Sequence, residues 1–269
     1  MSKTTVLLVN LGTPDSPSVS DVRSYLSQFL NDPRVIDIPY ILRKILVNLI
    51  IVPFRAPKSA KIYKDLWTPQ GSPIIIHGVA VKEKLQAQLG DDYVVELAMR
   101  YKNPSISSVL EKIRRTNPAK IIVVPLFPHY ASASTGSALQ EVMEVIKNWW
   151  VIPELSIISQ YWDHEGYINA FVECGKQYNL NEYDHVLFSY HGLPERQVDK
   201  VYDDGFCTDR DCEHEITEEN KFCYKAVCFG TTRKIAAKLG LDENQYTVCF
   251  QSRLDKKWIE PISDKEVIE

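Results

Sequence analysis

The chain has 269 residues, of which 45% are hydrophobic and 25% are charged. These fractions are those of an ordinary globular protein, and they exclude a disordered, collagen-like or coiled-coil chain. With 31 Lys and Arg against 35 Asp and Glu, the net charge of −4 argues against general nucleic-acid binding, which needs a basic surface. At roughly 150 residues per domain, the length predicts about two domains.

No run in the chain reaches the roughly 18–20 apolar residues that a membrane-spanning helix needs. The N-terminal run 4–10 is too short for a secretory signal and lacks a cleavage site, so we interpret it as a first strand. Six cysteines without such a signal indicate a reducing compartment and free thiols. The sequence therefore predicts a cytoplasmic protein.

Short β-type segments alternate with helical patterns along the chain. The predicted strands are Val6–Asn10, Tyr93–Met99, Ile121–Leu126, Leu155–Ser159, His185–Tyr190 and Tyr246–Gln251. The predicted helices are Ser18–Leu30, Val79–Leu89, Ser105–Arg115, Gly136–Asn148, Gly166–Tyr178 and Thr231–Leu239. Because several strands are apolar throughout, helices should cover both their faces, which predicts an α/β, doubly wound fold with parallel sheets.

A domain boundary is predicted near residues 150–165, where an aromatic segment containing a proline follows a helix. We expect an N-terminal α/β domain over 1–155 that contains a strongly apolar segment at 38–57. A C-terminal α/β domain should follow over 156–269, with a cysteine-rich insert at 203–228.

The common phosphate-binding loops and hydrolase motifs are absent, so the carboxyl ends of the strands are where a ligand should bind. At 123–137 a strand runs into a loop of small hydroxyl residues and then a helix, which favours an anion, although Ser134 or Thr135 alone can simply cap that helix. At 186–194 a buried strand ends at His191, followed by Gly and Pro. A neutral imidazole there can accept a proton or bind a metal, while a purely structural histidine is the alternative.

The residues around His191 resemble the signature of the ferrochelatases, the enzymes that insert ferrous iron into a porphyrin to form haem. Further segments match the family in order along the whole chain. The matching segments are 7–14, 71–74, 100–101, 127–130 with 134–137, 189–194, and 250–253 with Trp258.

The resemblance implies two similar Rossmann-like halves that hold the porphyrin in a cleft between them. It implies that His191 is the residue of the metal site, where it delivers iron or takes the pyrrole protons, and that protoporphyrin IX and Fe²⁺ are the substrates. The matching positions implied as porphyrin contacts are Arg55, Tyr63, Ser72, Arg100, Tyr101, Tyr130 and Trp258. A surface arginine and a core tyrosine are the alternatives at Arg55 and Tyr63.

The segment 38–57 is edged by Arg and Lys and is too short to span a membrane. It is able to form an amphipathic lip at the cleft mouth and to contact the inner membrane face peripherally. A buried helix is the alternative.

Four of the six cysteines, Cys207, Cys212, Cys223 and Cys228, lie within 22 residues. Paired thiols across a loop are typical of a metal site, and four thiolates suit Zn²⁺ or a [2Fe–2S] cluster. The family resemblance favours the cluster. Cys174 and Cys249 fall in a helical and a strand pattern, where we expect structural residues.

The family pattern normally continues beyond the Gln-Ser-Arg and Trp motifs to an acidic motif, and Glu266 and Glu269 come too early to match its glutamate. We therefore expect an incomplete C-terminal half. A truncated homologue that binds porphyrin or haem without metallating it is the alternative function. Two further alternatives are a metal-based interaction module on an inactive scaffold and chelation of cobalt into a corrin precursor.

Overall fold

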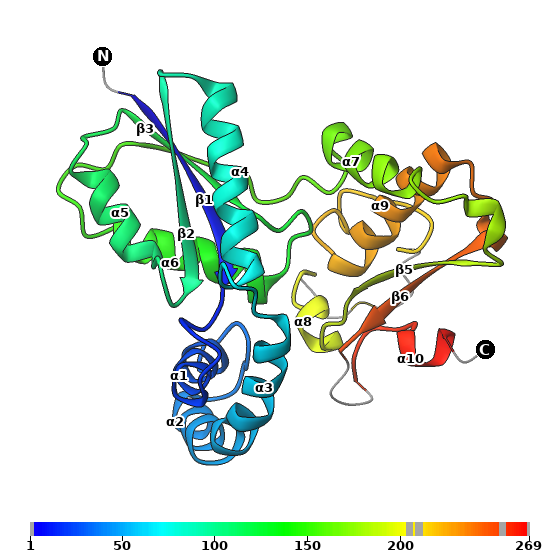
Figure 1. The fold of residues 1–269 in the computed structure, drawn as a ribbon, viewed down its shortest axis with the longest axis horizontal. Coiled ribbons are helices and arrows are strands. Elements are labelled where there is room, and N and C mark those ends of the chain that lie inside the picture. Colours follow the sequence, from blue (N-terminus) through cyan, green and yellow to red (C-terminus); the bar gives the residue numbers. More distant parts are fainter. Residues whose placement is uncertain (1–2, 203–206, 208–211, 253–256, 268–269) are drawn as a thin grey trace. The chain divides into compact units, whose positions relative to one another are not determined.

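The computed structural model describes residues 3–202, 207, 212–252 and 257–267. It divides into two compact units, the first formed by 1–127 with 132–159 and the second by 128–131 with 160–269 (Figure 1). Each unit contains a parallel sheet and helices, which confirms the predicted α/β class.

Four parallel strands form the sheet of the first unit, in the order β2-β1-β3-β4. Their bounds are Thr4–Gly12 for β1, Tyr93–Tyr101 for β2, Lys120–Pro125 for β3 and Glu154–Ile157 for β4. The central strand β1 pairs with both β2 and β3, and its last residue, Gly12, lies opposite Tyr101. Because the strands are parallel, their carboxyl ends share one edge of the sheet.

Helices cover both faces of this sheet, as the apolar strands predict (Figure 1). Helix α4 (Pro73–Leu89) packs on the face that presents Leu8 and Leu97. Helices α5 (Ile106–Arg114) and α6 (Ser137–Ile146) pack on the face that presents Leu7, Val9 and Ala98. A π-helical turn, η2 (Ser132–Gly136), leads directly into α6.

The segment between β1 and β2 also forms a separate helical cluster beyond the carboxyl end of β1. It consists of α1 (Val19–Leu30), α2 (Tyr40–Ile45), the π-helical η1 (Leu46–Ile51) and α3 (Val52–Leu66). Ser18 caps α1 by accepting a hydrogen bond from the Asp21 N–H, as its capping pattern predicts. Val22, Leu26 and Val47 lie in the core of this cluster. Among the described residues, no helix is long and apolar enough to cross a membrane.

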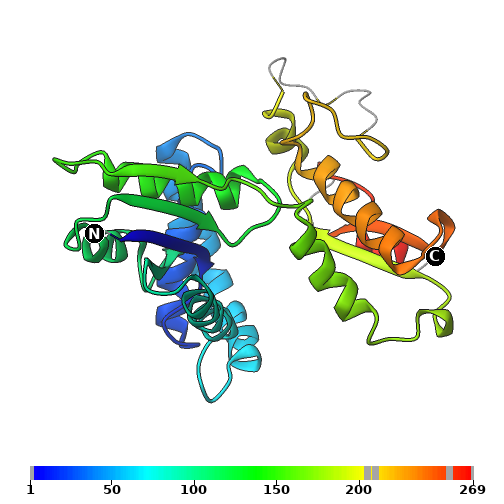
Figure 2. The same ribbon diagram turned by 90° about the horizontal axis from the view of Figure 1, so that it is seen from above.

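The second unit contains the parallel pair β5 (Val186–His191) and β6 (Tyr246–Gln251). Helices α7 (Glu165–Gly175) and α9 (Tyr224–Leu239) lie side by side (Figure 2). Phe188 of β5 packs against their shared core. Three short elements also lie in this unit: α8 (Glu195–Asp199), η3 (Leu180–Glu182) and η4 (Glu243–Gln245). A last helix, α10 (Ser263–Glu266), contacts β6.

All six predicted strands and all six predicted helices are present, with ends that differ by a few residues. The helices of 40–66, α8 and α10 are additional. The two largest differences lie at helix starts. Helix α4 begins at Pro73 rather than Val79, because proline suits the first turn of a helix and Ser72 precedes it as the N-cap. Helix α9 begins at Tyr224 rather than Thr231, since its first turns carry the apolar core residues Ala226 and Val227.

Candidate active site

His191 ends β5, beside the last residue of β6. Along β5 the side chains alternate between exposed and half-buried, and His191 is on the exposed face with Leu187 and Ser189. The protein around the imidazole lowers its pKa by partial burial. His191 is therefore neutral near pH 7 and reachable from solvent, which a proton acceptor requires.

Gly192 lets the chain turn closely against β6 directly after His191. A Cβ at Gly192 would lie 2.7 Å from the Gln251 carbonyl oxygen and 3.2 Å from the Trp258 ring. The Gly192 N–H donates to that same carbonyl over 2.7 Å, and Pro194 pairs with Trp258 in an isolated bridge. Trp258, another of the sequence-predicted site residues, thus packs against the turn that directly follows His191. Arg253 of the matched motif lies outside the described residues.

The other histidine that follows a strand end, His129, has a structural environment. Burial lowers the pKa of His129 to about 4. Its Nε2 lies 2.8 Å from the Thr231 hydroxyl, which donates its own hydrogen to the Trp162 carbonyl. Because that hydroxyl hydrogen is already used, His129 Nε2–H is the donor between the two side chains. His129 is therefore a neutral, buried histidine with a structural role, whereas His191 is exposed.

In the first unit, Arg55 and Tyr63 both lie on α3. Arg55 is exposed and Tyr63 is half-buried. Burial raises the pKa of Tyr63, and a hydrogen bond with Tyr25 and the charge of Arg55 oppose that rise. Ser72 is buried at the start of α4, and its hydroxyl donates to Thr13 over 3.0 Å. The Arg55 side chain is thus exposed to solvent, whereas Ser72 is hydrogen-bonded to the loop after β1.

Arg100 and Tyr101 end β2, and both side chains are bonded to other protein groups inside the first unit. Every nitrogen of the Arg100 guanidinium faces a protein acceptor: Nε faces Ser137, Nη2 faces Asp32 and Nη1 faces Glu141. Tyr101 is completely buried, so its ring offers no surface to a ligand in this structure. Sequence reasoning did not single out Asp32, because an aspartate just after a helix has no distinctive local pattern.

Tyr130 belongs to the second unit, where its half-buried ring meets Phe222 edge-on at a centroid distance of 5.9 Å. The predicted porphyrin contacts are therefore distributed over both units. Arg55, Tyr63, Ser72, Arg100 and Tyr101 lie in the first, and Tyr130 and Trp258 lie in the second.

Cys212, Cys223 and Cys228 of the 203–228 insert belong to one apolar core cluster of the second unit, and Cys207 packs against it. Cys207 and Cys223 hydrogen-bond to each other, whereas Cys228 is completely buried and hydrogen-bonded to Tyr224. Cys223 precedes α9 as its N-cap, with an extended backbone, whereas Cys228 lies inside that helix. In the described part of the chain, no three His, Cys, Asp or Glu side chains form a group that could hold a metal ion. Residues 203–206 and 208–211 of the insert lie outside that part.

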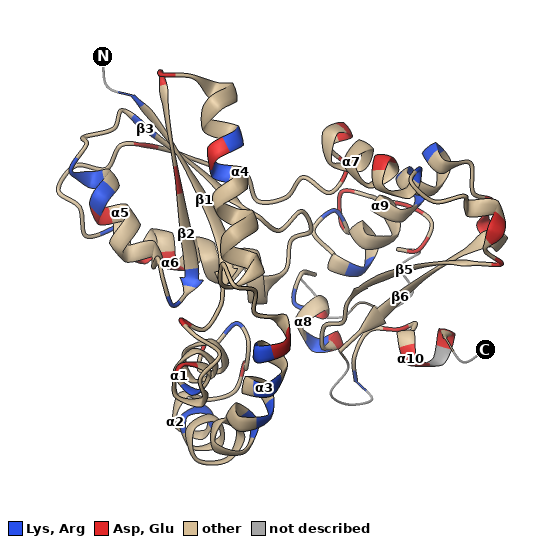
Figure 3. Cartoon of the chain, viewed as in Figure 1, with Lys and Arg blue, Asp and Glu red and all other residues tan. Residues whose placement is uncertain are grey.

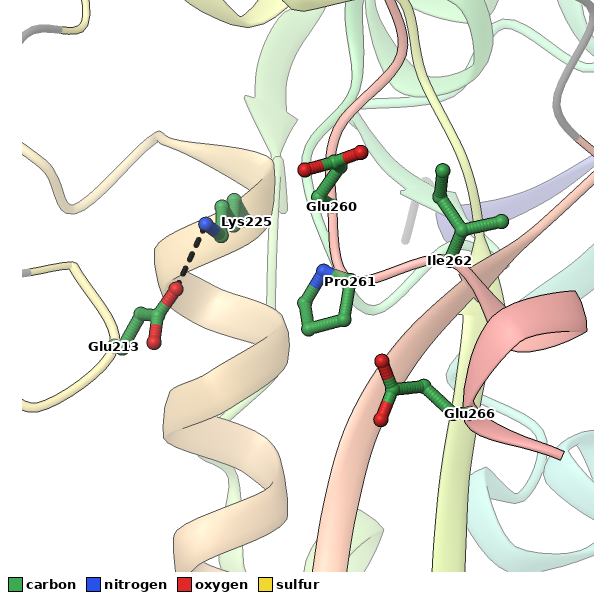
Figure 4. Close-up of a pocket in the computed structure, with 6 residues that line it drawn as sticks. All are labelled: Glu213, Lys225, Glu260, Pro261, Ile262 and Glu266. Atoms are coloured by element: carbon green, nitrogen blue, oxygen red, sulfur yellow. Dashed lines mark ion pairs between the residues drawn. The ribbon is translucent and has the colours of Figure 1, made fainter. Parts of the chain in front are cut away.

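A small pocket of about 320 Å³ lies in the second unit (Figure 4). Its lining residues are Glu213, Lys225, Glu260, Pro261, Ile262 and Glu266. Glu213 and Lys225 are an ion pair at 2.8 Å, and the remaining two carboxylates would repel an anionic ligand. None of the sequence-predicted porphyrin contacts lines this pocket.

Comparisons with known proteins agree with the resemblance in the sequence. The family model described as Ferrochelatase matches residues 3–269. A protein named Ferrochelatase from Coxiella burnetii (strain Dugway 5J108-111) is 46% identical over 272 residues, which cover 100% of this chain and 75% of the relative. One of the same name from Legionella pneumophila (strain Paris) is 43% identical over 261 residues, which cover 97% of this chain and 77% of the relative.

Proposed function

Because the chain belongs to the ferrochelatase family, we propose that His191 is the base that accepts pyrrole protons as ferrous iron enters the porphyrin. The chain is an enzyme of haem biosynthesis, a lyase-type metal chelatase whose substrates are Fe²⁺ and a porphyrin, for which we propose protoporphyrin IX. The observation that carries the role of His191 is its exposed imidazole at the end of β5, with a lowered pKa.

The proton balance explains why the reaction needs such a group. A free-base porphyrin has two pyrrole N–H groups, and both protons leave when Fe²⁺ binds the four nitrogens. His191 would accept the first proton at a ring nitrogen, release it to solvent and then accept the second. A neutral, exposed histidine can do both, whereas a buried one such as His129 cannot exchange protons with solvent.

Arg55 and Tyr63 of α3 form the proposed porphyrin-binding wall of the first unit. A guanidinium suits a propionate carboxylate, and an aromatic ring suits the macrocycle. Tyr130 and Trp258 are the corresponding proposals in the second unit, since both rings are half-buried and so retain an accessible surface. Ser72 would act on this wall by bracing the start of α4.

Replacing Arg55 by methionine tests this wall. Loss of a charge-assisted contact to a propionate should raise the porphyrin KM about 10–100-fold. Lys58→Met is the matched control, because Lys58 is another exposed cation of α3. Steady-state insertion of Fe²⁺ or Zn²⁺ at varied porphyrin concentration gives both constants. An equal effect of the two substitutions would contradict the assignment of Arg55.

We also propose that α2, η1 and α3 contact the inner face of a membrane peripherally. Large apolar side chains are exposed along these helices, among them Ile41, Leu49 and Phe54, at 70%, 69% and 75%. Lys and Arg residues recur along α3 (Figure 3). An apolar surface edged by cations suits an anionic bilayer.

Sedimentation with anionic vesicles tests the membrane proposal. Phe54→Glu should markedly reduce the vesicle-bound fraction, because it places a charge in the apolar surface. Trp150→Glu changes a fully exposed aromatic outside these helices and should leave binding intact. Absence of the wild-type chain from the vesicle pellet would contradict the proposal.

The proposed function assigns no zinc ion or [2Fe–2S] cluster to Cys207, Cys212, Cys223 and Cys228. Four-thiolate ligation would require Cys228 to leave the core and its hydrogen bond to Tyr224. No step of iron insertion is derived through these cysteines.

A further inference from the structure

The most heavily bonded buried carboxylate of the first unit belongs to Asp32, just after α1. Its side chain is 3% exposed. The Oδ2 atom accepts hydrogen bonds from Arg100 Nη2 at 2.7 Å, the Tyr101 hydroxyl at 2.9 Å and the Ser137 hydroxyl at 2.5 Å. The Oδ1 atom accepts from the Arg34 backbone N–H at 2.7 Å. Four donors therefore converge on one carboxylate.

Asp32 remains ionised despite its position. Burial alone would raise the pKa of Asp32, but the hydrogen bonds from Ser137 and the Arg34 N–H, together with the Arg100 charge, lower it below its ordinary value. Asparagine could not replace this carboxylate, because its NH₂ group would face a donor whichever way the amide is turned.

The Asp32 contacts reach the proposed porphyrin-binding wall through aromatic rings. Tyr101 meets Tyr25 edge-on at a centroid distance of 6.4 Å, and Tyr25 meets Tyr63 of α3 in the same way at 6.1 Å. Tyr63 and Arg55 both lie on α3, about two helical turns apart, so the position of the helix sets both side chains. A shift of the Tyr101 hydroxyl would therefore move the packing surface on which α3 rests.

The same segment also anchors the turn that follows β3. The Arg34 side chain donates through Nε to Gln140 at 2.6 Å and through Nη1 to the Ser132 hydroxyl at 2.8 Å. Ser132 begins η2 and Gln140 lies in the first turn of α6. The residues after α1 thus join the helical cluster, the end of β2 and the start of α6 at the carboxyl edge of the sheet.

We infer that Asp32 is a positioning residue for porphyrin, which holds Tyr101 and, through Tyr25, sets Tyr63 and Arg55 of α3 in their binding geometry. This inference rests on the proposed porphyrin-binding wall. It also gives Arg100 and Tyr101 a role: both act on porphyrin binding through Asp32 and the aromatic contacts, without touching the ligand.

Asp32→Asn tests the inference in the full chain. A misplaced wall should raise the porphyrin KM about 10–100-fold while kcat stays within a few-fold, because the residues at the reacting centre are unchanged. Glu96→Gln is the matched control, because Glu96 is another largely buried carboxylate. It is paired with Lys82 at 3.2 Å and with Lys112 at 2.5 Å. It lies on β2, away from the carboxyl edge of the sheet. The substitution should lower the melting temperature without changing the KM.

A porphyrin KM for Asp32→Asn equal to that of the wild type would overturn the inference, and so would an equal rise in Glu96→Gln. If Asp32→Asn does not fold, Tyr101→Phe decides, because it keeps the ring and removes one donor to Asp32; an unchanged KM would then overturn the inference. Arg55→Met distinguishes a failure of the proposed porphyrin-binding wall from a failure of the role of Asp32. If the porphyrin KM of Arg55→Met is unchanged, the proposed porphyrin-binding wall is contradicted. If the KM rises in Arg55→Met but not in Asp32→Asn, only the role of Asp32 is contradicted.

Discussion

Replacing His191 by alanine should reduce kcat for metal insertion about 10²–10⁴-fold, which is the usual contribution of a positioned general base. The porphyrin KM should change little, because Arg55 and Tyr63 lie on a different element. Anaerobic insertion of Fe²⁺, followed by absorbance, measures both constants. Added imidazole should restore part of the rate, since the His191 side chain is exposed and its removal opens the position to solvent.

His185→Ala is the matched control for this substitution. His185 is an exposed histidine immediately before β5, and its Nε2 lies 2.9 Å from the Thr247 hydroxyl. Its loss removes an imidazole from the same unit and should leave kcat unchanged. An equal loss of kcat in both variants, or full activity of His191→Ala, would contradict the role of His191.

The pH dependence of the insertion rate is a second, independent test of the role of His191 as a base. Its pKa lies below the ordinary value, and the neutral imidazole is the form that accepts a proton. The rate should therefore be constant at and above neutral pH and should fall as the pH decreases through this lowered pKa. His191→Ala should lose that acidic limb, whereas His185→Ala should keep it.

Gly12→Ala should destabilise the first unit by more than about 4 kcal/mol, the range reached only by severe core or backbone defects. Gly12 ends β1 with a φ of +108°, and a Cβ there would lie 2.0 Å from the Tyr101 carbonyl oxygen. That oxygen belongs to the paired strand β2, so it cannot rotate away as a side chain would. Urea unfolding followed by circular dichroism measures the loss.

Gly71→Ala separates backbone strain from the steric clash. Gly71 has a similar φ of +115°, but nothing lies within 4 Å of the position of its Cβ. Its substitution should cost only the strain of an unfavourable backbone conformation, about 1–3 kcal/mol. An equal loss of unfolding free energy in Gly12→Ala and Gly71→Ala would contradict the expected steric clash between Gly12 and the Tyr101 carbonyl.

The local patterns of the sequence predicted most of the secondary structure. Continuous apolar runs identified the strands, and the pattern of Ser18 and Asp21 identified the start of α1. The start of α9 was missed because its first turns face the core on several sides, so the helical periodicity there is weak. The ordered motifs also identified the family and His191, since those residues are adjacent in the chain.

Some properties of the site depend on contacts between residues far apart in the sequence. Asp32 meets Tyr101 and Ser137 only because α1, β2 and α6 converge at one edge of the sheet. The burial of His129 and the exposure of His191 likewise depend on which elements surround them.

The sequence by itself therefore determined the α/β class, the order of the elements, the family and the identity of the candidate base. The tertiary structure alone decided which histidine reaches solvent, that Cys228 is completely buried, and that Arg100 and Tyr101 are hydrogen-bonded to protein groups. The physical reason is that periodicity and motifs record local geometry and chemistry, whereas burial and hydrogen-bond partners are set by packing between distant segments.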